Sequence, residues 1–426
     1  MNILADSRVV MLVWNGFVSD ARVLREATSL AAEQADVNII AIRTPARDVA
    51  DERIEPRVRA VRVKRSAGWP GRLVMAPRFL VRRFLSAAYR RLGMTPPTPF
   101  RGRPRWWQLD RRLVFLIEEL AVNSRMFRKA VSLQPTVVHA HDVNTLFPAW
   151  LAARRCGAKL VYDAHEISAD REGYHGRVWL VKLVERFLGK AADGRITTTQ
   201  ARADWFKEEY GYPDMAVLQN RPVRRIVEHS DRIRRTFGIA ADRPVVLYQG
   251  GLQWGRGLRN LLEAVRGLPD AHLVFVGDGI QRASLEEEAA SVPGRVHFAG
   301  MVPLDELPEW TASADVGVQC LRNTCLNHYT TDSNKLFEYV MGGLPVVASD
   351  FPEIRRIVEA YDLGFLVDPD DVDAIRGALR KLLEDKAVRE RCSANARRAR
   401  DELDWTSQSS ELLGLYGKFL DPAASP

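Results

Sequence analysis

The sequence has few of the features that mark secreted or membrane-spanning proteins. Its four cysteines are scattered and form no Cys-x-x-Cys pair, so neither a disulfide framework nor a cysteine-based zinc site is expected, and a reducing cytoplasm fits. No stretch reaches about 18 apolar residues, so no transmembrane helix is expected. Asp6 and Arg8 interrupt the apolar N-terminus, and no signal peptide is expected there.

The composition is that of a folded protein with an unevenly distributed charge. The chain has 426 residues, 46% of them hydrophobic and 27% charged, which favours two domains of about 200 residues each. The formal net charge is +8, yet residues 57–129 hold 19 basic residues against three acidic ones, so the remainder is net negative. We infer that the basicity belongs to a local site.

Both halves of the chain alternate short apolar strands with helical patterns, as a parallel α/β sheet requires. The strands predicted in the first half are Val9–Trp14, Val37–Ile42, Thr136–His139, Lys159–Tyr162 and Gly194–Thr198. The strands predicted in the second half are Pro244–Tyr248, His272–Val276, Val296–Ala299, Val316–Cys320, Pro345–Ala348 and Gly364–Val367. Helical patterns, such as Arg22–Gln34 and Lys335–Met341, separate these strands.

This alternation predicts an α/β protein of two Rossmann-like, doubly wound domains that face each other across a cleft. We expect residues 1–222 to form an acceptor-side domain and residues 223–404 a nucleotide-binding domain, with a helix at 405–420 packing back on the first. Ligands of such sheets bind outside the carboxyl ends of the strands.

Residues 57–129 do not follow the alternation, and they interleave arginines with aromatic residues. Met75–Tyr89 has the pattern of an amphipathic helix. An anionic membrane surface is the favoured partner of this segment. A solvated loop without a partner is the second interpretation, and nucleic acid is the least favoured of the three.

A glycine-rich turn joins a strand to a helix within Leu247–Val265, "LYQGGLQWGRGLRNLLEAV". Gly250 and Gly251 allow close backbone approach, and the helix N-terminus offers free N–H groups to an anion. Arg256 stands at the turn, where a guanidinium can grip a diphosphate. The alternative is a tight strand–helix connection without a ligand.

A second polar group lies at the start of the helix in Ser333–Asp350, "SNKLFEYVMGGLPVVASD". Helical spacing puts Lys335 and Glu338 on the same face as Asn334. The lysine suits a phosphate and the carboxylate suits a ribose diol, whereas the alternative is a surface ion pair.

Histidines end a strand in "VVHAHDVN", and "VYDAHE" ends the next one. His139, His141, Asp142 and His165 are the candidate ligands of a zinc cluster, but no metal site is expected, since nothing in the sequence fixes their geometry. Asp20 and Arg22, which follow the first strand, are candidates to line the same cleft. The acidic run "DPDD" at Asp368–Asp371 is expected to cap the helix after it.

Seven collinear segments resemble family 4 of the retaining glycosyltransferases, which have the GT-B fold. They are "DARVLREA", "VVHAHD", "VYDAHE", "YQGGLQWGRGL", "LVFVGDG", "VHFAGMVP" and "NKLFEYVMGGLPVVASDFPE", and the resemblance covers nearly the whole chain.

The resemblance implies a role for each matching residue. Arg256 and Lys335 would bind the donor diphosphate, and Glu338 would hold the ribose hydroxyls. His141 would lie near the donor sugar and the reaction centre, with His139 as the alternative. The backbone of Met301 and Val302, after Gly300, would contact the base.

Two departures from the family pattern concern the donor. Gly251 stands where the family commonly has an arginine, and Arg256 replaces the family's lysine. Thr330 stands where the first of two paired glutamates usually contacts the donor sugar. Asp332, Ser333 and Asn334 are the candidate substitutes, and an altered choice of sugar is expected.

The resemblance therefore implies a retaining glycosyltransferase that moves a sugar from a nucleotide diphosphate sugar to an acceptor hydroxyl. A glycan or lipid-linked acceptor in cell-envelope or polysaccharide synthesis is expected, with no cofactor and no metal. The expected location is cytoplasmic or peripheral on the inner face of the plasma membrane. A nucleotide-sugar epimerase, an inactive donor-binding subunit and a nicotinamide oxidoreductase are the alternatives.

Overall fold

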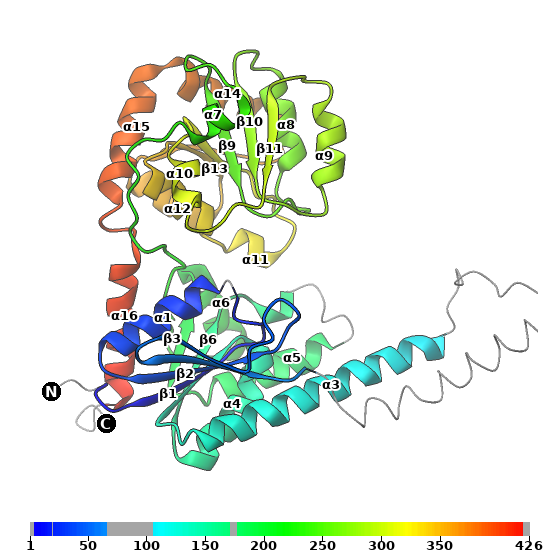
Figure 1. Ribbon diagram of the computed structural model, residues 1–426, viewed down its shortest axis with the longest axis vertical. Coiled ribbons are helices and arrows are strands. Elements are labelled where there is room, and N and C mark those ends of the chain that lie inside the picture. The colour runs from blue at the N-terminus through cyan, green and yellow to red at the C-terminus, as the bar shows by residue number, and fades with distance from the viewer. Residues whose placement is uncertain (1–3, 19, 66–104, 171–176, 421–426) are drawn as a thin grey trace, which may run out of the picture. The chain divides into compact units, whose positions relative to one another are not determined.

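The computed structural model describes residues 4–18, 20–65, 105–170 and 177–420. The chain divides into two compact units. The first unit contains residues 1–163, 180–195 and 416–426, and the second contains residues 164–179 and 196–415. Each sheet is flanked by helices (Figure 1), and this confirms the α/β class predicted from the alternating pattern.

The first sheet has eight strands in the order β3-β4-β2-β1-β5-β6-β7-β8. β1 runs parallel to β2 and to β5, while β3 runs antiparallel to β4. The strands are β1 (Arg8–Leu12), β2 (Asp36–Ile42), β3 (Asp51–Glu55), β4 (Val58–Val63), β5 (Val137–His141), β6 (Lys159–Ala164), β7 (Gly194–Thr197) and β8 (Ala216–Val217).

Helices connect these strands and cover the sheet. They are α1 (Ala21–Ala32), α3 (Arg105–Ser132), α4 (Val143–Cys156), η1 (Ser168–Asp170), α5 (Val178–Val184), η2 (Glu185–Gly189) and α6 (Gln200–Tyr210). α1 begins at an N-cap, Asp20, whose carboxylate accepts a hydrogen bond from the backbone of Val23 at 3.2 Å.

The start and end of the basic segment are regular structure, contrary to the prediction that residues 57–129 break the alternation. β4 pairs with β2, and α3 runs through the last part of the segment. The sequence pattern does not reveal β4, because Arg59 and Arg62 interrupt its apolar residues. Both are paired within the sheet, Arg59 with Asp51 and Arg62 with Glu52. The predicted helix at Met75–Tyr89 lies outside the described residues.

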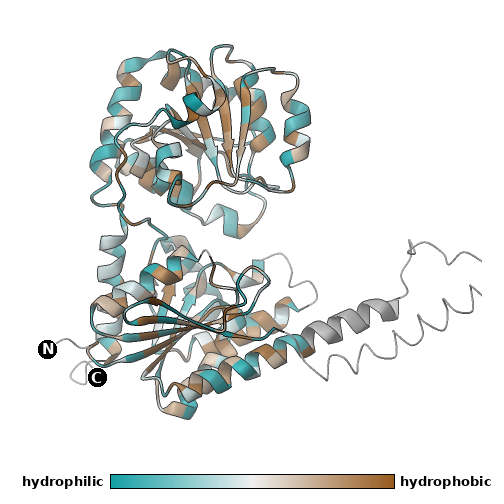
Figure 2. Ribbon diagram, in the orientation of Figure 1, coloured by the Kyte–Doolittle hydropathy of each residue, from teal (hydrophilic) through white to brown (hydrophobic). Residues whose placement is uncertain are grey.

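The second sheet has six strands in the order β11-β10-β9-β12-β13-β14, and its pairings are all parallel. The strands are β9 (Val245–Gln249), β10 (His272–Val276), β11 (Val296–Gly300), β12 (Val316–Gln319), β13 (Val346–Ser349) and β14 (Gly364–Val367). Each agrees with the predicted strand to within a residue. In Figure 2 hydrophobic strands lie at the centre, and the outward faces of the helices are hydrophilic.

The helices of this part of the chain follow the predicted pattern, including the predicted helix at 405–420. They are α7 (Arg232–Phe237), α8 (Leu258–Arg266), α9 (Arg282–Ala289), α10 (Leu307–Thr311), α11 (Leu326–Tyr329), α12 (Asn334–Gly342), α13 (Pro352–Ala360), α14 (Val372–Glu384), α15 (Lys386–Ala399) and α16 (Trp405–Leu420). Of these, α7, α11 and α15 are additional to the prediction. The carboxylate of Asp371 accepts a hydrogen bond from the backbone of Ala374 at 2.9 Å, which confirms the predicted cap of α14.

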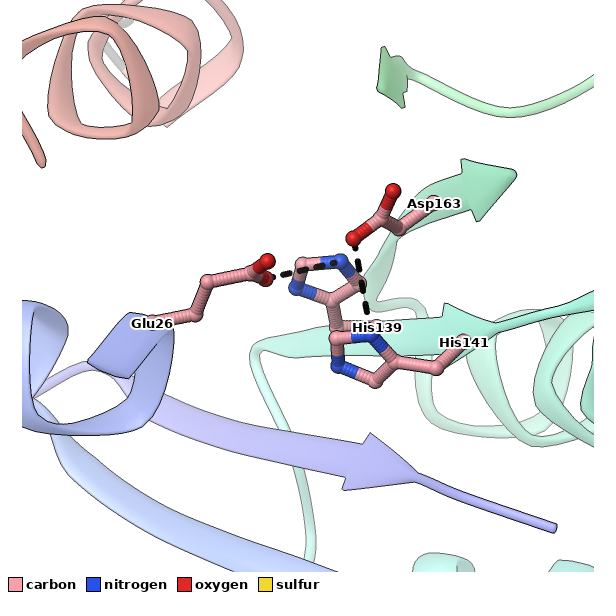
Figure 3. A group of neighbouring side chains, drawn as sticks. All are labelled: Glu26, His139, His141 and Asp163. Atoms are coloured by element: carbon pink, nitrogen blue, oxygen red, sulfur yellow. Dashed lines mark ion pairs between the residues drawn. The ribbon is translucent and has the colours of Figure 1, made fainter. Parts of the chain in front are cut away.

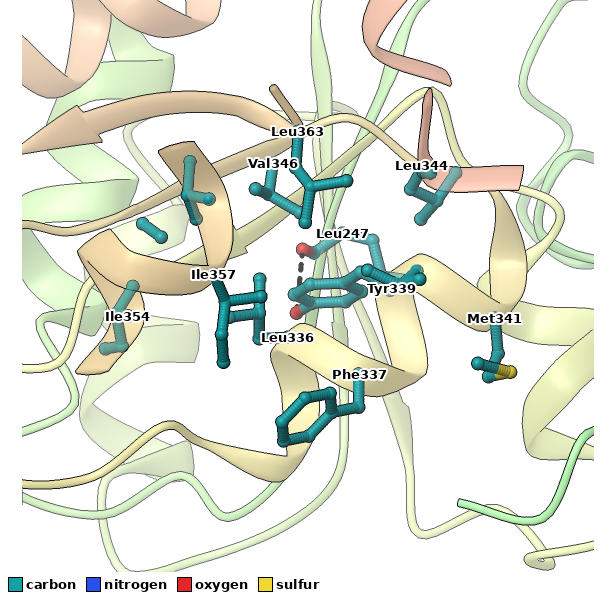
Figure 4. Packing of buried hydrophobic residues seen from close by; sticks show 14 of the residues in the cluster. Leu247, Leu336, Phe337, Tyr339, Met341, Leu344, Val346, Ile354, Ile357 and Leu363 are labelled. Atoms are coloured by element: carbon teal, nitrogen blue, oxygen red, sulfur yellow. Dashed lines mark hydrogen bonds between the residues drawn. The ribbon is translucent and has the colours of Figure 1, made fainter. Parts of the chain in front are cut away.

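α12 is anchored on the sheet by one tyrosine (Figure 4). The Tyr339 hydroxyl accepts from the backbone N–H of Gln249 at 3.2 Å and donates to the carbonyl of Val318 at 2.9 Å. Figure 4 marks its longer contact with the carbonyl of Leu247, at 3.4 Å. Its ring lies on Gly317, where an added Cβ would come within 2.5 Å of the ring. Leu336 and Val340 pack into the same core. The first turn of α12 is thereby held at the end of β9 and β12.

Both sheets reverse their strand order beside a central strand. In the first sheet the reversal lies between β1 and β5, and in the second between β9 and β12. A crevice opens outside the carboxyl ends of the strands at such a switch point. The glycine-rich turn follows β9, and the histidines lie on β5, so both stand beside these switch points.

No helix among the described ranges is both long and apolar enough to span a bilayer.

Candidate functional site

Neighbouring backbone carbonyl groups pack closely against the glycine-rich turn after β9. Gly250 has a φ of 125°, and its N–H donates to the carbonyl of Val276 at 2.7 Å. Gly257 has a φ of 66° and lies against the carbonyl oxygen of Cys320, only 2.0 Å from where a Cβ would stand. Glycine is required at both positions, because a side chain would be strained and would clash.

Lys335 reaches this turn from the first turn of α12. A Cβ added to Gly250 would lie 2.6 Å from the Lys335 Cε. The ammonium is 5.5 Å from the centre of the Tyr248 ring, at a distance suited to a cation–π contact. Burial and the charge of Arg256 together lower the pKa of Lys335 to about 8, against the opposing charge of Glu338. The lysine therefore stands in a place that favours an anion.

Arg256 and Lys335 act on each other electrostatically, so the structure brings both predicted phosphate-binding residues together. Arg256 is partly exposed on the turn between β9 and α8. Together the two cations form a positive site, which a diphosphate would neutralise.

Glu338 is held by a residue that sequence reasoning missed. The amide nitrogen of Gln249 donates to Glu338 Oε2 at 2.5 Å, and the amide oxygen of Gln249 accepts from the Thr311 hydroxyl at 2.9 Å. Gln249 is buried at the end of β9. Its signal in the sequence is a polar residue at the end of an otherwise apolar strand, directly before the glycines.

The residues predicted to contact the base and the sugar are more exposed. Gly300 ends β11 with a φ of 72°, and its carbonyl accepts from the N–H of Gly277 at 2.8 Å. Met301 is 77% exposed, while Val302 packs partly against the core. Asn334 is exposed at the first position of α12. The backbone after Gly300 is thus accessible to a ligand.

The side chain of Thr330, which replaces the family glutamate, lies in the protein interior. Its hydroxyl accepts from Arg202 Nε at 3.2 Å and donates to the carbonyl of Leu326 at 2.8 Å. Its own carbonyl accepts from the Thr199 hydroxyl at 2.8 Å. Thr330 is buried, so its hydroxyl is occupied within the fold.

The candidate substitutes for that glutamate differ in their surroundings. Asp332 is buried and accepts from the amide of Gln219 at 2.9 Å, and burial raises the pKa of Asp332 to about 6. Ser333 is buried as well and has a positive φ of 58°. Only Asn334 of the three is exposed.

The histidines form a separate cluster in the first unit (Figure 3). His139 and His141 lie on the same face of β5, and their rings stack with centroids 4.3 Å apart. Glu26 of α1 lies 3.8 Å from His139 Nε2, and Asp163 of β6 lies 3.6 Å from His141 Nδ1. All four side chains are buried.

Arg22 supplies the positive charge of this cluster. Its guanidinium contacts Glu26 at 3.0 Å and Asp163 at 2.9 Å. Burial alone would lower the pKa of Arg22, but the charges of Asp163 and Glu26 raise it above its usual value. Asp20 and Arg22 were expected to line a ligand cleft; instead Asp20 caps α1 and Arg22 is buried in the cluster.

The four candidate metal ligands named from the sequence differ from the group that the structure brings together. Among the described residues, the group whose ligand atoms lie within 4.8 Å of one another consists of Glu26, His139, His141 and Asp163. Asp142 and His165 do not belong to it. The two carboxylates come from segments far from the histidines in the sequence, and spacing alone therefore did not reveal them.

The last turn of α16 completes the cluster. The hydroxyl of Tyr416 lies 2.9 Å from His139 Nδ1, and burial raises the pKa of Tyr416 well above its usual value. His139 is thereby engaged on both ring nitrogens, by Tyr416 and by the Glu26 carboxylate. His141 is the one of the pair that stands last on β5.

Comparison with known families agrees with this arrangement. Residues 229–399 match the glycosyl transferases group 1 model, and residues 19–221 match the glycosyl transferase 4-like domain. The two matches follow one another along the chain and include the glycine-rich turn, α12 and the histidine strand. The chain belongs to the GT-B glycosyltransferases. Within that class it is a family 4-like glycosyltransferase.

Curated relatives are distant in sequence. The sulfoquinovosyl transferase SQD2 of Arabidopsis thaliana is 27% identical over 69% of this chain, and the match spans 58% of that protein, less than two thirds of its length. The phosphatidyl-myo-inositol mannosyltransferase of Mycobacterium leprae is 26% identical over 70% of this chain and 77% of its own.

Solved structures share the fold over nearly the full length. Sucrose-phosphate synthase of Thermosynechococcus elongatus has a TM-score of 0.75 at 17% identity and covers 98% of this chain and 100% of its own. HepE of Anabaena in complex with UDP-glucose has a TM-score of 0.66 at 15% identity, with 97% and 100% covered. At these identities the likeness establishes the GT-B fold alone.

Proposed function

We propose that this glycosyltransferase moves a sugar from a nucleoside diphosphate sugar to an acceptor hydroxyl with retention of the anomeric configuration. The observation that carries the proposal is the convergence of Arg256 and Lys335 on the glycine-rich turn after β9. Binding of UDP-glucose by HepE, a neighbour in fold, supports a donor of this class.

The main catalytic requirement of the site is to stabilise the leaving diphosphate. As the anomeric bond breaks, negative charge accumulates on the diphosphate, and preorganised cations lower the barrier most where that charge develops. Lys335 is held in place by the turn backbone and by the Tyr248 ring before any ligand arrives. Arg256 and the N–H groups at the start of α8 supply the rest of the stabilisation.

Glu338 is proposed to bind the ribose hydroxyls. Its Oε2 is fixed by Gln249, which leaves the carboxylate oriented rather than free to rotate. The backbone after Gly300 is proposed to contact the base, and Gly250 and Gly251 to allow close approach of the phosphates. His141 is proposed, from the family resemblance, to act near the donor sugar.

Retention is proposed to occur by attack of the acceptor on the same face that the diphosphate leaves. A double displacement would need a carboxylate placed as the nucleophile. Around the described donor residues, Glu338 is bonded to Gln249 and Asp332 is buried against Gln219. A leaving-group oxygen can take the proton of the acceptor, so no separate base is required. No cofactor and no metal are proposed.

A glycan or lipid-linked acceptor is proposed, with a role in cell-envelope or polysaccharide synthesis. The names of two relatives support a lipid or inositol acceptor, a phosphatidyl-myo-inositol mannosyltransferase and a D-inositol 3-phosphate glycosyltransferase. The basic residues within 57–129 are proposed to contact anionic lipid at the inner face of the plasma membrane. Co-sedimentation with anionic but not with neutral vesicles is the expected result, and equal binding to both would remove the membrane proposal.

The function is tested by incubating the protein with UDP-, GDP- and ADP-sugars and a lipid and glycan acceptor panel, with and without EDTA. One donor is expected to be consumed at the same rate in EDTA, and proton NMR of the product should show the anomeric configuration of the donor. An inverted product would overturn retention. Binding of a donor without turnover of any acceptor would favour an inactive donor-binding subunit.

A further inference from the structure

His328 lies beside the proposed diphosphate site, although neither the sequence pattern nor the family resemblance singles it out. It belongs to α11, the short helix between β12 and α12, and is partly buried. A Cβ added to Gly255 would lie 2.9 Å from its Cε1 atom, so the imidazole packs directly on the glycine-rich turn, next to Arg256.

Hydrogen bonds fix which nitrogen of this ring carries a proton. His328 Nδ1 lies 2.8 Å from the Thr324 hydroxyl and 3.1 Å from the carbonyl oxygen of Arg322. A carbonyl oxygen only accepts, so Nδ1 holds the hydrogen and donates it. The neutral ring therefore has its lone pair on Nε2, and a second proton would enter there.

The charges around His328 keep it neutral while no anion is bound. Burial lowers its pKa below the usual value, Arg256 and Lys335 lower it further, and the Arg322 carbonyl and Asp170 oppose them. These groups reach the ring from the turn, from α12, from its own loop and from η1. The guanidinium of Arg322 is directed elsewhere and pairs with Asp370.

We propose that His328 is a third cationic contact for the diphosphate of the donor, and that donor binding is coupled to uptake of one proton at His328 Nε2. The inference rests on the proposed function and names a further binding residue within that site. The proton comes from solvent and forms a new N–H bond, which the bound diphosphate stabilises; no other bond changes.

The physical reason is that the bound diphosphate changes the electrostatic potential at His328 from positive to negative. Without ligand, His328 faces two cations and is disfavoured as a third. A diphosphate carries two negative charges, and beside Arg256 and Lys335 it turns that repulsion into attraction for an imidazolium. The charge of the ligand also raises the pKa of Lys335. This effect appears at higher pH, because the pKa of Lys335 without ligand is about 8.

The experiment is isothermal titration of UDP-glucose, GDP-mannose and ADP-glucose into the full chain from pH 6 to 9, in two buffers with different ionisation enthalpies. Both phosphates of these donors are esterified, so the charge of the ligand stays constant over this range. For the donor that binds, we expect net proton uptake and a dissociation constant that rises severalfold between pH 6 and 7.5, because the bound diphosphate raises the pKa of His328 from its lowered value.

His328→Gln should bind the same donor with no pH dependence between 6 and 7.5, while the weakening above pH 8, due to Lys335, remains. His272→Gln is the matched control, because His272 also has a pKa lowered by burial but stands at the start of β10, paired with His297; this variant should keep the wild-type profile. Donor binding with no buffer-dependent heat, or an unchanged profile in His328→Gln, overturns the inference and leaves the proposed function standing. Failure of all three donors to bind overturns both.

Discussion

The side chain of Lys335 lies across the Cα of Gly250, with its Cε 2.6 Å from the point where a Cβ would stand. The first turn of α12 and the turn after β9 are therefore fitted to each other before any donor is present. A phosphate that approaches the glycine backbone meets the ammonium group at the same place.

Gly250→Ala should displace Lys335 and weaken donor binding at least tenfold. The new methyl group would both clash with Lys335 Cε and force alanine into a φ of 125°, a strain of about 1–3 kcal/mol. Titration calorimetry with the bound donor measures the effect. Gly294→Ala is the control: its φ is also positive, at 73°, but nothing lies within 4 Å of the added methyl. Equal donor affinities in the two variants would contradict the fit between Lys335 and the turn.

Gln249→Leu should weaken binding of the nucleoside diphosphate at least tenfold, because it removes the hydrogen-bond donor that orients Glu338, and a hydrogen bond to a charged group is worth about 1.5–3 kcal/mol. Titration with the sugar donor measures this loss, and thermal melting should stay near the wild type, because the Thr311 hydroxyl keeps the Leu307 carbonyl as an acceptor at 2.9 Å. Gln253→Ala, on the same turn but exposed, should bind as the wild type does. Full affinity in Gln249→Leu would show that Glu338 needs no such support.

Donor affinity should fall as the pH rises above 8. Burial and Arg256 lower the pKa of Lys335 to about 8 in the free protein, and a bound diphosphate would raise it again. Below pH 8 Lys335 is already charged and takes up no proton on binding. Above pH 8 each binding event must protonate Lys335, and affinity drops up to about tenfold per pH unit. Titrations in Lys335→Arg should lack this drop. A flat profile to pH 9.5 in the wild type would refute the charge assignment.

Asp332→Asn should stabilise the protein at pH 8 and have little effect at pH 4. Burial raises the pKa of Asp332 from 3.8 to about 6 in the folded state. The folded state therefore binds this proton more tightly than the unfolded state, and the stability it provides is present below pH 3.8 and lost as the pH rises through 6. The asparagine keeps the acceptor for Gln219 and avoids the buried charge, for a gain of about 3 kcal/mol. Thermal melting at both pH values is the measurement, and a lower melting temperature at pH 8 would count against it.

The sequence predicts the second sheet well because its strands are short, apolar and separated by helices with clear periodicity. Leu273–Val276 and Val346–Ala348 have no competing interpretation. It predicts β3 poorly, because Asp51–Glu55 is mostly charged and lies at the sheet edge. There the charges are paired with arginines of the neighbouring strand, which no local pattern can show.

For the candidate sites, too, the sequence predicts residues in local patterns but not their partners from distant segments. The sequence singles out Arg256, Lys335 and Glu338 as candidates because each belongs to a local pattern, a glycine-rich turn or the start of a helix. The partners that give these residues their properties were not found. Gln249 is 89 positions from Glu338, and Asp163 is 141 positions from Arg22. Only the order of parallel strands brings such residues together, and a pattern in one sequence does not specify that order in enough detail to pair side chains.

The central claim is that Arg256 and Lys335 stabilise the departing diphosphate. The most direct test is the rate of nucleoside diphosphate release from the accepted donor, in the presence of acceptor, by the wild type, by Lys335→Ala and by Lys386→Ala, whose lysine is exposed on α15. The account predicts that Lys335→Ala loses on the order of 10²-fold in turnover while its melting temperature stays near that of the wild type, and that Lys386→Ala is unaffected. A folded Lys335→Ala variant that turns over at the wild-type rate would contradict it.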